Sequence, residues 1–328
     1  MKNKIIILVA FIFITFFVVF KFSGFDLSSA QNNFNNITAT TSVSLLFVGD
    51  IMLSRGVNYE LVQLEKSTTS KEFLDIIPFQ NIASVTRKYD LTIGNLETPI
   101  VANGKYGRPD QVVFNTNPKY IKNLKNAGFD ILTLANNHSM DKGLSGASST
   151  MSLLAAAGID SFGIGDKCHE GIIKEVNGIK IGFLGYSYTA FNHTLYSPDK
   201  FVCDLNDFET VKKDVKNILE KVDVVVVYTH SGIEYEKAAS AKDVQKMRAL
   251  IDVGVKVVVN THPHVIQRTE KYKDGVIAYS LGNFVFDQER ESNKKGKMLE
   301  VQIENKNIKS YKDIPIYIKN FCCPEILK

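Results

Sequence analysis

The sequence predicts a mixed fold of the α/β or α+β class, in which two sheets pack together and helices cover their outer faces. Short apolar strands rich in valine and isoleucine alternate with segments of helical periodicity, which is typical of parallel strands joined by crossover helices. Two antiparallel hairpins are also predicted, so the sheets are expected to be mixed. Polar side chains of metal-binding types follow six of the strands, which indicates where a functional site lies.

The composition is that of a globular protein. At 328 residues the chain can bury a sizeable core, as one large domain or two smaller ones. The formal net charge of +4 is small for this length and the lysines are spread along the chain, so no nucleic-acid partner is predicted. The four cysteines lack the spacing of a zinc site, and the adjacent Cys322 and Cys323 are not a usual disulfide framework. The cysteines therefore do not indicate whether the protein works in an oxidising or a reducing compartment.

Residues 1–22 are predicted to be a membrane anchor. Two lysines precede an unbroken apolar run from Ile5 to Phe20, and positive charge ahead of such a run predicts a single-pass protein whose domain lies on the extracytoplasmic side of the cell membrane. A cleaved signal peptide, with Ser28-Ser29-Ala30 as the cleavage site and a secreted product, is the alternative. Residues 23–42 are rich in Ser, Asn and Thr and are predicted to be a flexible linker.

Six strands are predicted to form the framework of a domain at residues 43–290. They cover residues 44–48, 90–93, 129–135, 222–228, 255–260 and 276–281. In the same order they lead into Asp50; Asn95 and Glu97; Asn136, Asn137 and His138; His230; His262 and His264; and Asn283 with Asp287. Because active sites of α/β proteins lie at the carboxyl ends of the strands, we expect these side chains to share one site.

Four helices are predicted between the strands, at residues 117–128, 148–157, 207–221 and 238–252. Two hairpins complete the domain. The first spans residues 172–186 and turns at Asn177-Gly178, a pair that suits a type I′ turn. The second joins residues 298–303 to Ile308 and beyond, so residues 291–328 are assigned to a C-terminal hairpin and tail of the same domain.

The segment Thr261-His262-Pro263-His264 gives the strongest single indication of a metal. Two imidazoles one residue apart, held by a proline that fixes φ, suit a metal site better than a core. Two ordinary loop histidines are the alternative for this segment taken alone. With the other strand ends, the sequence predicts one or two divalent ions, of Mn, Fe, Zn or Mg.

A hydrolytic metal centre needs oxygen ligands and imidazoles, and two ions usually share a bridging carboxylate. Six residues at the strand ends are predicted to be ligands: Asp50, Glu97, Asn137, His230, His262 and His264. An imidazole beside such a centre can act as general acid for the leaving group, and His138 is placed for that role. Taken singly, Asp50 could equally cap a helix and Glu97 could be a surface carboxylate.

Six short motifs carry a family resemblance. They are Gly49-Asp50-Ile51-Met52, Asn95-Leu96-Glu97-Thr98-Pro99, Leu134 to Gly143, His230-x-Gly232-x-Glu234, Thr261 to Gln267, and Gly282 to Gln288. In order and spacing they resemble the CapA family, the poly-γ-glutamate capsule synthesis proteins within the calcineurin-like metallophosphoesterase superfamily. The resemblance covers about Val43 to Gln288, most of the chain.

The resemblance implies a metallophosphoesterase-like four-layer α/β/β/α sandwich of two mixed sheets. It assigns the same six metal ligands and the same general acid, His138, and places the bridging carboxylate at Glu97. Supporting or substrate-binding roles fall on Asn95, Asn136, Asp141, Glu234, Gln267, Asn283 and Asp287. The chain departs from the superfamily at Met52, which stands where a histidine is usual, and at Asn95-Leu96-Glu97, which replaces a Gly-Asp-x-x-Asp motif.

The resemblance also predicts the function. A membrane-anchored, metal-dependent hydrolase or transferase is expected to act outside the membrane in the synthesis, export or anchoring of an anionic polymer such as poly-γ-glutamate. Its expected partners are that polymer or a phosphoester substrate, together with membrane-bound synthase or export subunits. Two alternatives stay open: a non-catalytic subunit of a capsule synthesis or export complex, and an extracellular metallophosphoesterase.

Overall fold

The computed structural model describes residues 41–102, 112–188 and 201–327. The chain from Thr41 onward forms one compact unit. None of the helices among the described residues is long and apolar enough to cross a membrane. The predicted anchor at residues 1–22, and residues 23–40 of the linker predicted at 23–42, lie outside the described residues and stay predictions. The end of the predicted linker differs, because Ser42 already belongs to the first strand.

The first sheet has eight strands and contains the strand that opens the domain. Its strands are β1 (Ser42–Ile51), β2 (Leu91–Leu96), β3 (Ile131–Thr133), β4 (Asp160–Phe162), β11 (Asn283–Val285), β12 (Lys295–Glu304), β13 (Asn307–Lys319) and β14 (Cys323–Ile326). Their order is β14-β13-β12-β1-β2-β3-β4, and β11 pairs with the end of β1. β1 to β4 are parallel, whereas β12, β13 and β14 are antiparallel. The predicted C-terminal hairpin is therefore confirmed as β12 and β13.

The second sheet has six strands in the order β5-β6-β7-β8-β10-β9. They are β5 (Ile172–Val176), β6 (Ile179–Ser187), β7 (Val224–His230), β8 (Val257–Thr261), β9 (Thr269–Tyr272) and β10 (Gly275–Ala278). The four inner strands are parallel, and β5 and β9 are antiparallel at the two edges. The predicted hairpin at Asn177-Gly178 is confirmed, and both residues have the positive φ of a type I′ turn.

The two sheets pack face to face because their strands alternate between two apolar surfaces. In β1, Val43, Leu45 and Phe47 belong to the core between the sheets, whereas Leu46 and Val48 belong to the core beneath the helices. This follows from the two-residue repeat of a strand. β7 and β8 bury both faces in the same way, which explains why their valines form continuous runs.

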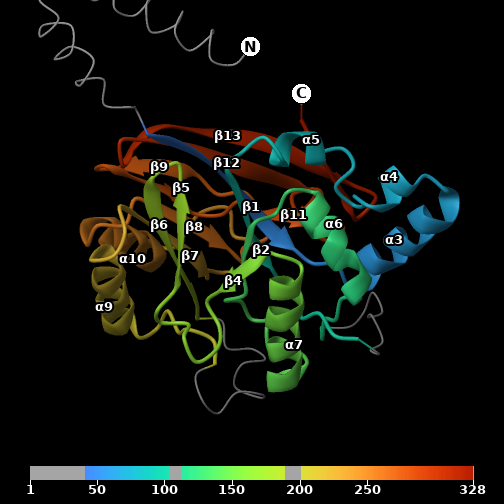
Figure 1. Ribbon diagram of the computed structural model, residues 1–328, viewed down its shortest axis with the longest axis horizontal. Helices are drawn as coiled ribbons and strands as arrows, with labels where there is room; N and C mark the ends of the chain where they lie inside the picture. Colours follow the sequence, from blue (N-terminus) through green and yellow to red (C-terminus); the bar gives the residue numbers. More distant parts are fainter. Residues whose placement is uncertain (1–40, 103–111, 189–200, 328) are drawn as a thin grey trace, which may run out of the picture. The chain divides into compact units, whose positions relative to one another are not determined.

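Helices cover both outer faces and make four layers (Figure 1). α9 (Phe208–Leu219) and α10 (Ala241–Asp252) pack on the second sheet. The first sheet is covered by α3 (Arg55–Ser67), α4 (Lys71–Leu74), α5 (Ala83–Thr86), the 3₁₀ turn η1 (Pro118–Tyr120), α6 (Ile121–Asn126) and α7 (Gly143–Ala156). The helix–sheet–sheet–helix arrangement confirms the predicted four-layer sandwich of two mixed sheets.

Two of the predicted helices differ from their predictions, and three helices were not predicted. The helix predicted at residues 117–128 is a 3₁₀ turn followed by the six-residue α6, and the helix predicted from residue 148 begins earlier, at Gly143. The unpredicted helices are the short α4 and α5 and the longer α3. This helix buries only Val57 and Leu61 completely, so its apolar stripe is too narrow to stand out in the sequence.

All four cysteines are paired in disulfides, a pairing that the sequence analysis did not predict. Cys168 is joined to Cys203, and Cys322 to the adjacent Cys323. The first bond ties the segment before β5 to the segment before α9, and both of its cysteines are buried. Spacing along the chain could not reveal this pair because the two residues are brought together only by the fold.

Candidate metal centre

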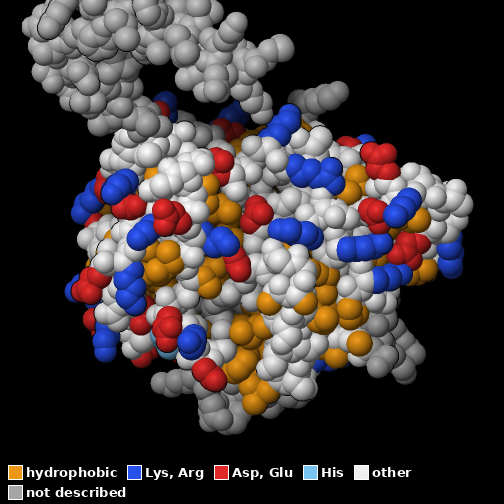
Figure 2. Space-filling model, in the orientation of Figure 1, with side chains coloured by type: hydrophobic (Ala, Val, Ile, Leu, Met, Phe, Trp, Pro, Cys, Tyr) orange, Lys and Arg blue, Asp and Glu red, His pale blue; other side chains and the backbone are white. Residues whose placement is uncertain are grey.

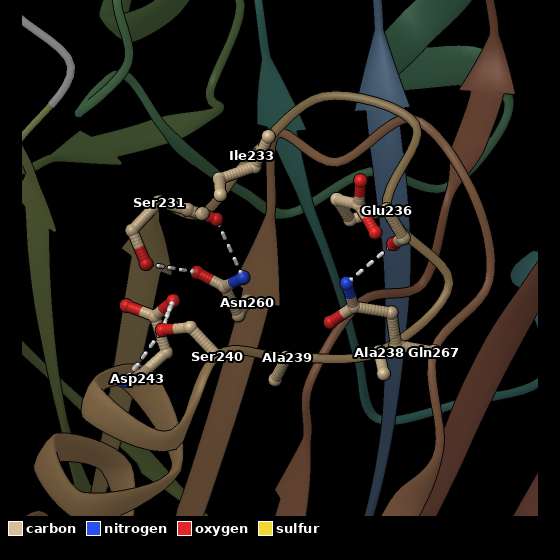
Figure 3. A pocket seen from close by; sticks show the side chains of 10 residues that line it. Ser231, Ile233, Glu236, Ala238, Ala239, Ser240, Asp243, Asn260 and Gln267 are labelled. Atoms are coloured by element: carbon tan, nitrogen blue, oxygen red, sulfur yellow. Dashed lines mark hydrogen bonds between the residues drawn. The ribbon is translucent and has the colours of Figure 1, made fainter.

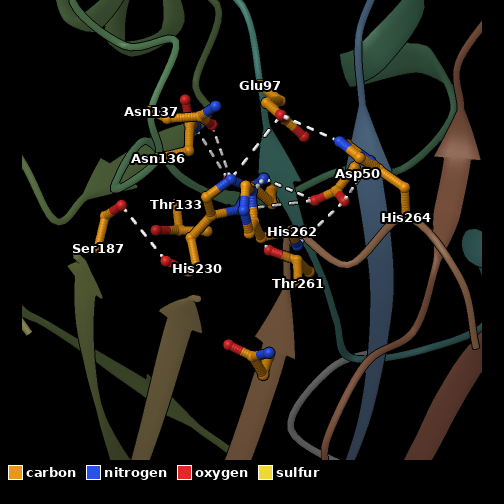
Figure 4. A network of polar contacts seen from close by, with 12 residues as sticks. Asp50, Glu97, Thr133, Asn136, Asn137, Ser187, His230, Thr261, His262 and His264 are labelled. Atoms are coloured by element: carbon orange, nitrogen blue, oxygen red, sulfur yellow. Dashed lines mark hydrogen bonds and ion pairs between the residues drawn. The ribbon is translucent and has the colours of Figure 1, made fainter. Parts of the chain in front are cut away.

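The predicted ligands come together in one buried cluster (Figure 4), and Nε2 of the predicted general acid, His138, lies 3.9 Å from Oε1 of Glu97. Asp50 lies in β1, Glu97 after β2, Asn137 and His138 after β3, His230 at the end of β7, and His262 and His264 after β8. Their side chains range from fully buried to 9% exposed. Because β1 to β3 belong to one sheet and β7 and β8 to the other, the cluster forms where strand ends of the two sheets meet.

Asp50 is fixed by neighbours from three strand ends. Its Oδ1 accepts a 2.8 Å hydrogen bond from Nδ2 of Asn95, and its Oδ2 lies 3.4 Å from Nδ1 of His264 and 3.3 Å from the His262 backbone nitrogen. Burial alone raises the pKa of Asp50, but the hydrogen bond with His264 and the charges of His230 and His264 outweigh it and lower this pKa to about 2. Asp50 is therefore an anion at neutral pH.

Glu97 is the least satisfied group in the cluster. Its backbone nitrogen donates to the Ile51 carbonyl at 2.9 Å, which fixes Glu97 beside the end of β1. Both carboxylate oxygens are buried and lack a hydrogen-bond partner among the described residues. Instead, Oε1 faces three imidazoles, at 3.8 Å from Nε2 of His230, 3.8 Å from Nε2 of His264 and 3.9 Å from Nε2 of His138.

Distances of 3.8 Å are too long for hydrogen bonds, yet they suit two ligands of one ion. A divalent ion lies about 2.0–2.2 Å from each nitrogen or oxygen ligand, so two ligands of the same ion can be nearly 4 Å apart. A buried carboxylate without donors is costly unless a cation balances it. The arrangement around Glu97 therefore fits a metal.

Hydrogen bonds orient two of the histidines. Nδ1 of His264 lies 2.8 Å from Oδ1 of Asn283, and an amide oxygen only accepts, so Nδ1 carries the proton and Nε2 is free to bind a metal. Nδ1 of His230 lies 2.9 Å from the hydroxyl of Thr261, and its Nε2 lies 2.9 Å from Oδ1 of Asn137. The neighbours thus aim His264 Nε2 at Glu97, and they hold His230 between Glu97 and Asn137.

The turn after β8 has an unusual backbone. His262 has φ +95° and His264 has φ +56°, a region that residues other than glycine rarely adopt. Such strain is common at functional sites, where the surrounding structure holds it in place. Here Nδ2 of Asn293 donates to the His264 carbonyl at 2.9 Å and supports the turn. The result is that both imidazoles point into the cluster.

Burial controls the charge of the remaining groups. Burial and the nearby His262 hold the pKa of His230 well below its usual value, and burial and His264 lower the pKa of His262 to about 4. Both imidazoles are therefore neutral at pH 7, the form that binds metal. Burial, followed by the charge of Asp50, raises the pKa of Glu97 well above its usual value. A bound cation would reverse this shift.

His138 is held more rigidly than the sequence alone indicates. Its Nδ1 lies 2.8 Å from Oδ2 of Asp141, so Nε2 is directed toward Glu97. The Phe114 ring stacks on the imidazole, with ring centres 3.8 Å apart and an interplanar angle of 17°. The backbone nitrogen of Phe114 also donates to Oδ2 of Asp141 at 2.5 Å. Phe114 thus orients both the imidazole and its carboxylate partner.

Two more of the predicted supporting residues contact the cluster. Asn136 donates from Nδ2 to Oδ1 of Asn95, at 3.0 Å, and to the Leu96 carbonyl. Asn95 in turn contacts Asp50 and lies 3.3 Å from Nδ1 of His230. These amides hold the ends of β1, β2 and β7 together.

Two other predicted supporting residues lie elsewhere. Gln267 donates to the backbone carbonyl of Glu236. The carboxylate of Asp287 forms an ion pair with Arg55 and accepts from the Gly56 backbone nitrogen, and its supporting or substrate-binding role stays a prediction. The sequence could not show this contact, because Arg55 lies far from Asp287 along the chain, at the start of the unpredicted α3.

Ligand-type side chains form two groups in this region. In each group, one ligand-type atom per residue lies within 4.8 Å of the others. One group contains Asp50, Glu97 and His230, and the other contains Glu234, His262 and His264. Carboxylate and imidazole ligands together suit Mn, Fe or Zn. The described residues thus offer a chemically suitable place for a divalent ion.

A cavity of about 230 Å³ lies beside the cluster, between the loop after β7 and the start of α10 (Figure 3). Its lining includes Ser231, Ile233, Ser240, Asn260 and Gln267. Asn260 forms part of the cavity wall, and its Nδ2 donates to the carbonyls of Ser231 and Tyr279 at 3.0 and 2.8 Å. Ser231 and Asn260 are each close in sequence to a site histidine, so the cavity adjoins the histidine-bearing turns.

The sequence of residues 44–288 matches the family model described as bacterial capsule synthesis protein PGA_cap. The chain belongs to this family. A PGA biosynthesis protein CapA from Bacillus subtilis is 35% identical over 254 residues, which cover 75% of this chain and 64% of that protein. A capsule biosynthesis protein CapA from Bacillus anthracis is 30% identical over 262 residues, covering 75% of this chain and 60% of that protein. The chain thus spans under two thirds of the length of these capsule proteins.

Solved structures confirm the fold of this capsule-family chain. A putative 5′-nucleotidase from Staphylococcus aureus superposes with a TM-score of 0.53 at 14% identity, covering 87% of this chain and 54% of that one. A hypothetical protein from Thermus thermophilus gives a TM-score of 0.51 at 14% identity, covering 83% of this chain and 98% of that one. At this level of identity the likeness concerns the fold alone.

Proposed function

We propose that this capsule-family protein is a metal-dependent hydrolase or transferase that acts on an anionic cell-surface polymer outside the membrane. The observation that carries the proposal is Glu97, a fully buried carboxylate without hydrogen-bond partners among the described residues, which faces three imidazole nitrogens at 3.8–3.9 Å. A structural role alone leaves this arrangement unexplained, because a buried carboxyl group without a hydrogen-bond partner destabilises a fold.

Asp50, Glu97, Asn137, His230, His262 and His264 would hold the metal. When bound, a divalent ion supplies Lewis-acid polarisation of a carbonyl or phosphoryl oxygen and activates water. His138 then gives a proton from Nε2 to the leaving group, because Asp141 occupies its Nδ1. The same residues serve a γ-amide or a phosphoester, since both reactions need an activated nucleophile and a protonated leaving group.

Two arginines lie near the centre, and one of them favours an anionic substrate. The guanidinium of Arg55 lies 4.6 Å from the centre of the Phe114 ring, which stacks on His138. That of Arg290 lies 4.3 Å from the centre of the Tyr235 ring, which is 6.4 Å from the His264 ring. One aromatic residue therefore separates each arginine from a site histidine. The exposed guanidinium of Arg290 can attract carboxylates or phosphates, whereas that of Arg55 is already paired with Asp287.

The proposed location and partners come from the sequence and the family. The apolar run of residues 5–20 supports a single-pass anchor with the domain outside, and buried disulfides are typical of extracytoplasmic proteins. We therefore place the protein at the outer surface of the cell membrane, with poly-γ-glutamate or a similar polymer as substrate. Membrane-bound synthase or export subunits are its proposed partners.

A non-catalytic role within a capsule complex is the second candidate, and Met52 favours it. Met52 is buried, and its sulfur accepts the backbone N–H of Ser54 at 3.1 Å. A thioether is a poor ligand for hard divalent ions. This part of the centre therefore lacks an imidazole that a catalytic metal site would use.

Substitution of His138 separates the two candidates. We expect His138→Ala to lower turnover about 10²- to 10⁴-fold, because the general acid is lost while the proposed metal ligands stay. Hydrolysis of p-nitrophenyl phosphate and of a γ-linked glutamate oligomer by the Mn²⁺-loaded full chain would be measured together with metal content. His169→Ala is the control, since His169 is half-exposed and pairs with Asp214 outside the centre. Metal binding without any His138-dependent turnover would favour the non-catalytic role.

A further inference from the structure

The loop that follows β7 brings an exposed carboxylate close to two histidines of the centre. Glu234, His262 and His264 each offer a ligand-type atom, and these atoms lie within 4.8 Å of one another. The group of Asp50, Glu97 and His230 is adjacent, because Nε2 of His264 is 3.8 Å from Oε1 of Glu97. Two potential ion positions therefore lie side by side.

His262 supplies independent evidence for a ligand at the second position. Its side chain is only 6% exposed, and its Nδ1 is buried without a hydrogen-bond partner among the described residues. Its ring is also turned by the strained backbone at φ +95°. A buried ring nitrogen without a partner is unfavourable, and a metal ion is one of the few groups that satisfies its lone pair.

The loop holds Glu234 in place although its side chain is exposed. On one side of Glu234, the backbone nitrogen of Ser231 donates to the Thr261 carbonyl at 3.1 Å. On the other side, the Tyr235 nitrogen donates to the Pro263 carbonyl at 2.8 Å, and Gln267 donates to the Glu236 carbonyl at 2.7 Å, a bond visible in Figure 3. The loop is thus fastened to the very turn that carries His262 and His264.

The balance of charge also favours a second ion. Asp50, Glu97 and Glu234 together contribute three negative charges, and the imidazoles are neutral as ligands. A single divalent cation leaves the cluster with a net charge of about −1, which repels an anionic substrate, whereas two divalent cations leave about +1. The second state suits a substrate that carries carboxylates or phosphates.

We propose that Glu234 completes a second divalent-cation position with His262 and His264, beside the position formed by Asp50, Glu97 and His230. This inference rests on the proposed metal-dependent function and specifies its ion count. Glu234 supplies an oxygen ligand from a loop, whereas Met52, which directly follows β1, offers only a thioether. Because Glu234 is exposed, the second ion binds more weakly and exchanges faster than the first.

Titration of the metal-free full chain with Mn²⁺ tests this inference, with free Mn²⁺ measured by electron paramagnetic resonance. We expect two ions to bind the unaltered protein with different affinities. Glu234→Gln should weaken the second ion about tenfold or more and leave the first unchanged. Glu236→Gln is the matched control, because this neighbouring exposed glutamate belongs to neither ligand group. Glu97→Gln should weaken both ions, and circular dichroism verifies that every variant is folded.

Two results would overturn the inference and leave the proposed metal-dependent function in place. One is a single bound ion in the unaltered protein. The other is two ions that bind the Glu234→Gln variant with the same affinities as they bind the unaltered protein. Absence of any Mn²⁺ binding, by contrast, would overturn both. The two failures are thus distinguished within one titration.

Discussion

At the scale of single residues, the centre combines buried groups whose charges are set by their surroundings. Asp50 stays ionised because histidines approach it, whereas Glu97 is driven toward its protonated form by burial. His230 and His262 are kept neutral by the same burial. A cation that binds here must displace any proton held by Glu97, so we expect metal affinity to fall as the pH is lowered.

The stability of the metal-free protein should depend on His262. Its pKa falls from 6.5 in the unfolded chain to about 4 in the folded one, so its contribution is fully present above pH 6.5 and is lost as the pH falls toward 4. Between pH 7 and pH 5 this loss amounts to about 2 kcal/mol. Urea unfolding in the presence of a chelator at these two pH values measures it.

The His262→Asn variant provides the comparison, because it removes the titrating group at that position. It should lose about 2 kcal/mol less stability than the unaltered protein between pH 7 and pH 5. Glu97 has the opposite effect on stability, because its pKa is raised in the folded protein. Its contribution to the stability of the fold declines as the pH rises above the usual pKa of a glutamate. A Glu97→Gln variant should therefore lose more stability on acidification. Equal losses in all three proteins would contradict these assignments.

At the scale of elements, local sequence signals support helices that lie away from the centre. α9 begins at Asp207, whose side chain accepts from the Thr210 backbone nitrogen at 3.2 Å and from its hydroxyl at 2.8 Å. Val211, Val215 and Ile218 then bury one face of the helix against the second sheet. α9 thus supports the sheet that carries His230 at the end of β7 without touching the centre itself.

Removing this cap should lower the stability of the fold without changing its function. We expect Asp207→Ala to lower the free energy of unfolding by about 1 kcal/mol, the usual cost of losing an N-cap side chain. Metal content and turnover at 25 °C should stay unchanged, because the folded centre is intact. Thermal unfolding followed by circular dichroism measures the first effect. A comparable loss of metal binding would show that α9 and the centre are coupled.

At the scale of the whole molecule, two sheets pack face to face, their strand ends meet at the centre, and helices cover both outer faces (Figure 1). The described surface on the face shown in Figure 2 carries interspersed basic and acidic side chains, with apolar side chains gathered around α7. The Cys168–Cys203 disulfide joins segments 35 residues apart on the side of the second sheet. It fastens the connection between β4 and β5 to the one that leads into α9.

Loss of this disulfide should destabilise the domain. Closing a loop of this length lowers the entropy of the unfolded chain, so we expect the Cys168→Ser/Cys203→Ser variant to lose about 3–4 kcal/mol of stability. Guanidinium unfolding of the full chain, with and without reductant, measures the effect. The double variant should be insensitive to reductant at this position. An unfolding midpoint unchanged by both reductant and substitution would contradict a structural role for the bond.

The sequence by itself determined the sandwich, most of its strands, and the residues that meet at the centre. Apolar runs such as Val224 to Val227 predict buried strands, and the polar residues that follow these runs mark the strand ends. Tertiary structure alone decided the contacts between distant segments: Phe114 on His138, Arg55 with Asp287, and Cys168 with Cys203. It also decided that Glu234 approaches His262. These pairs leave no periodic trace in the sequence, because they depend on how loops close over the sheets and not on the regular repeat of any strand or helix.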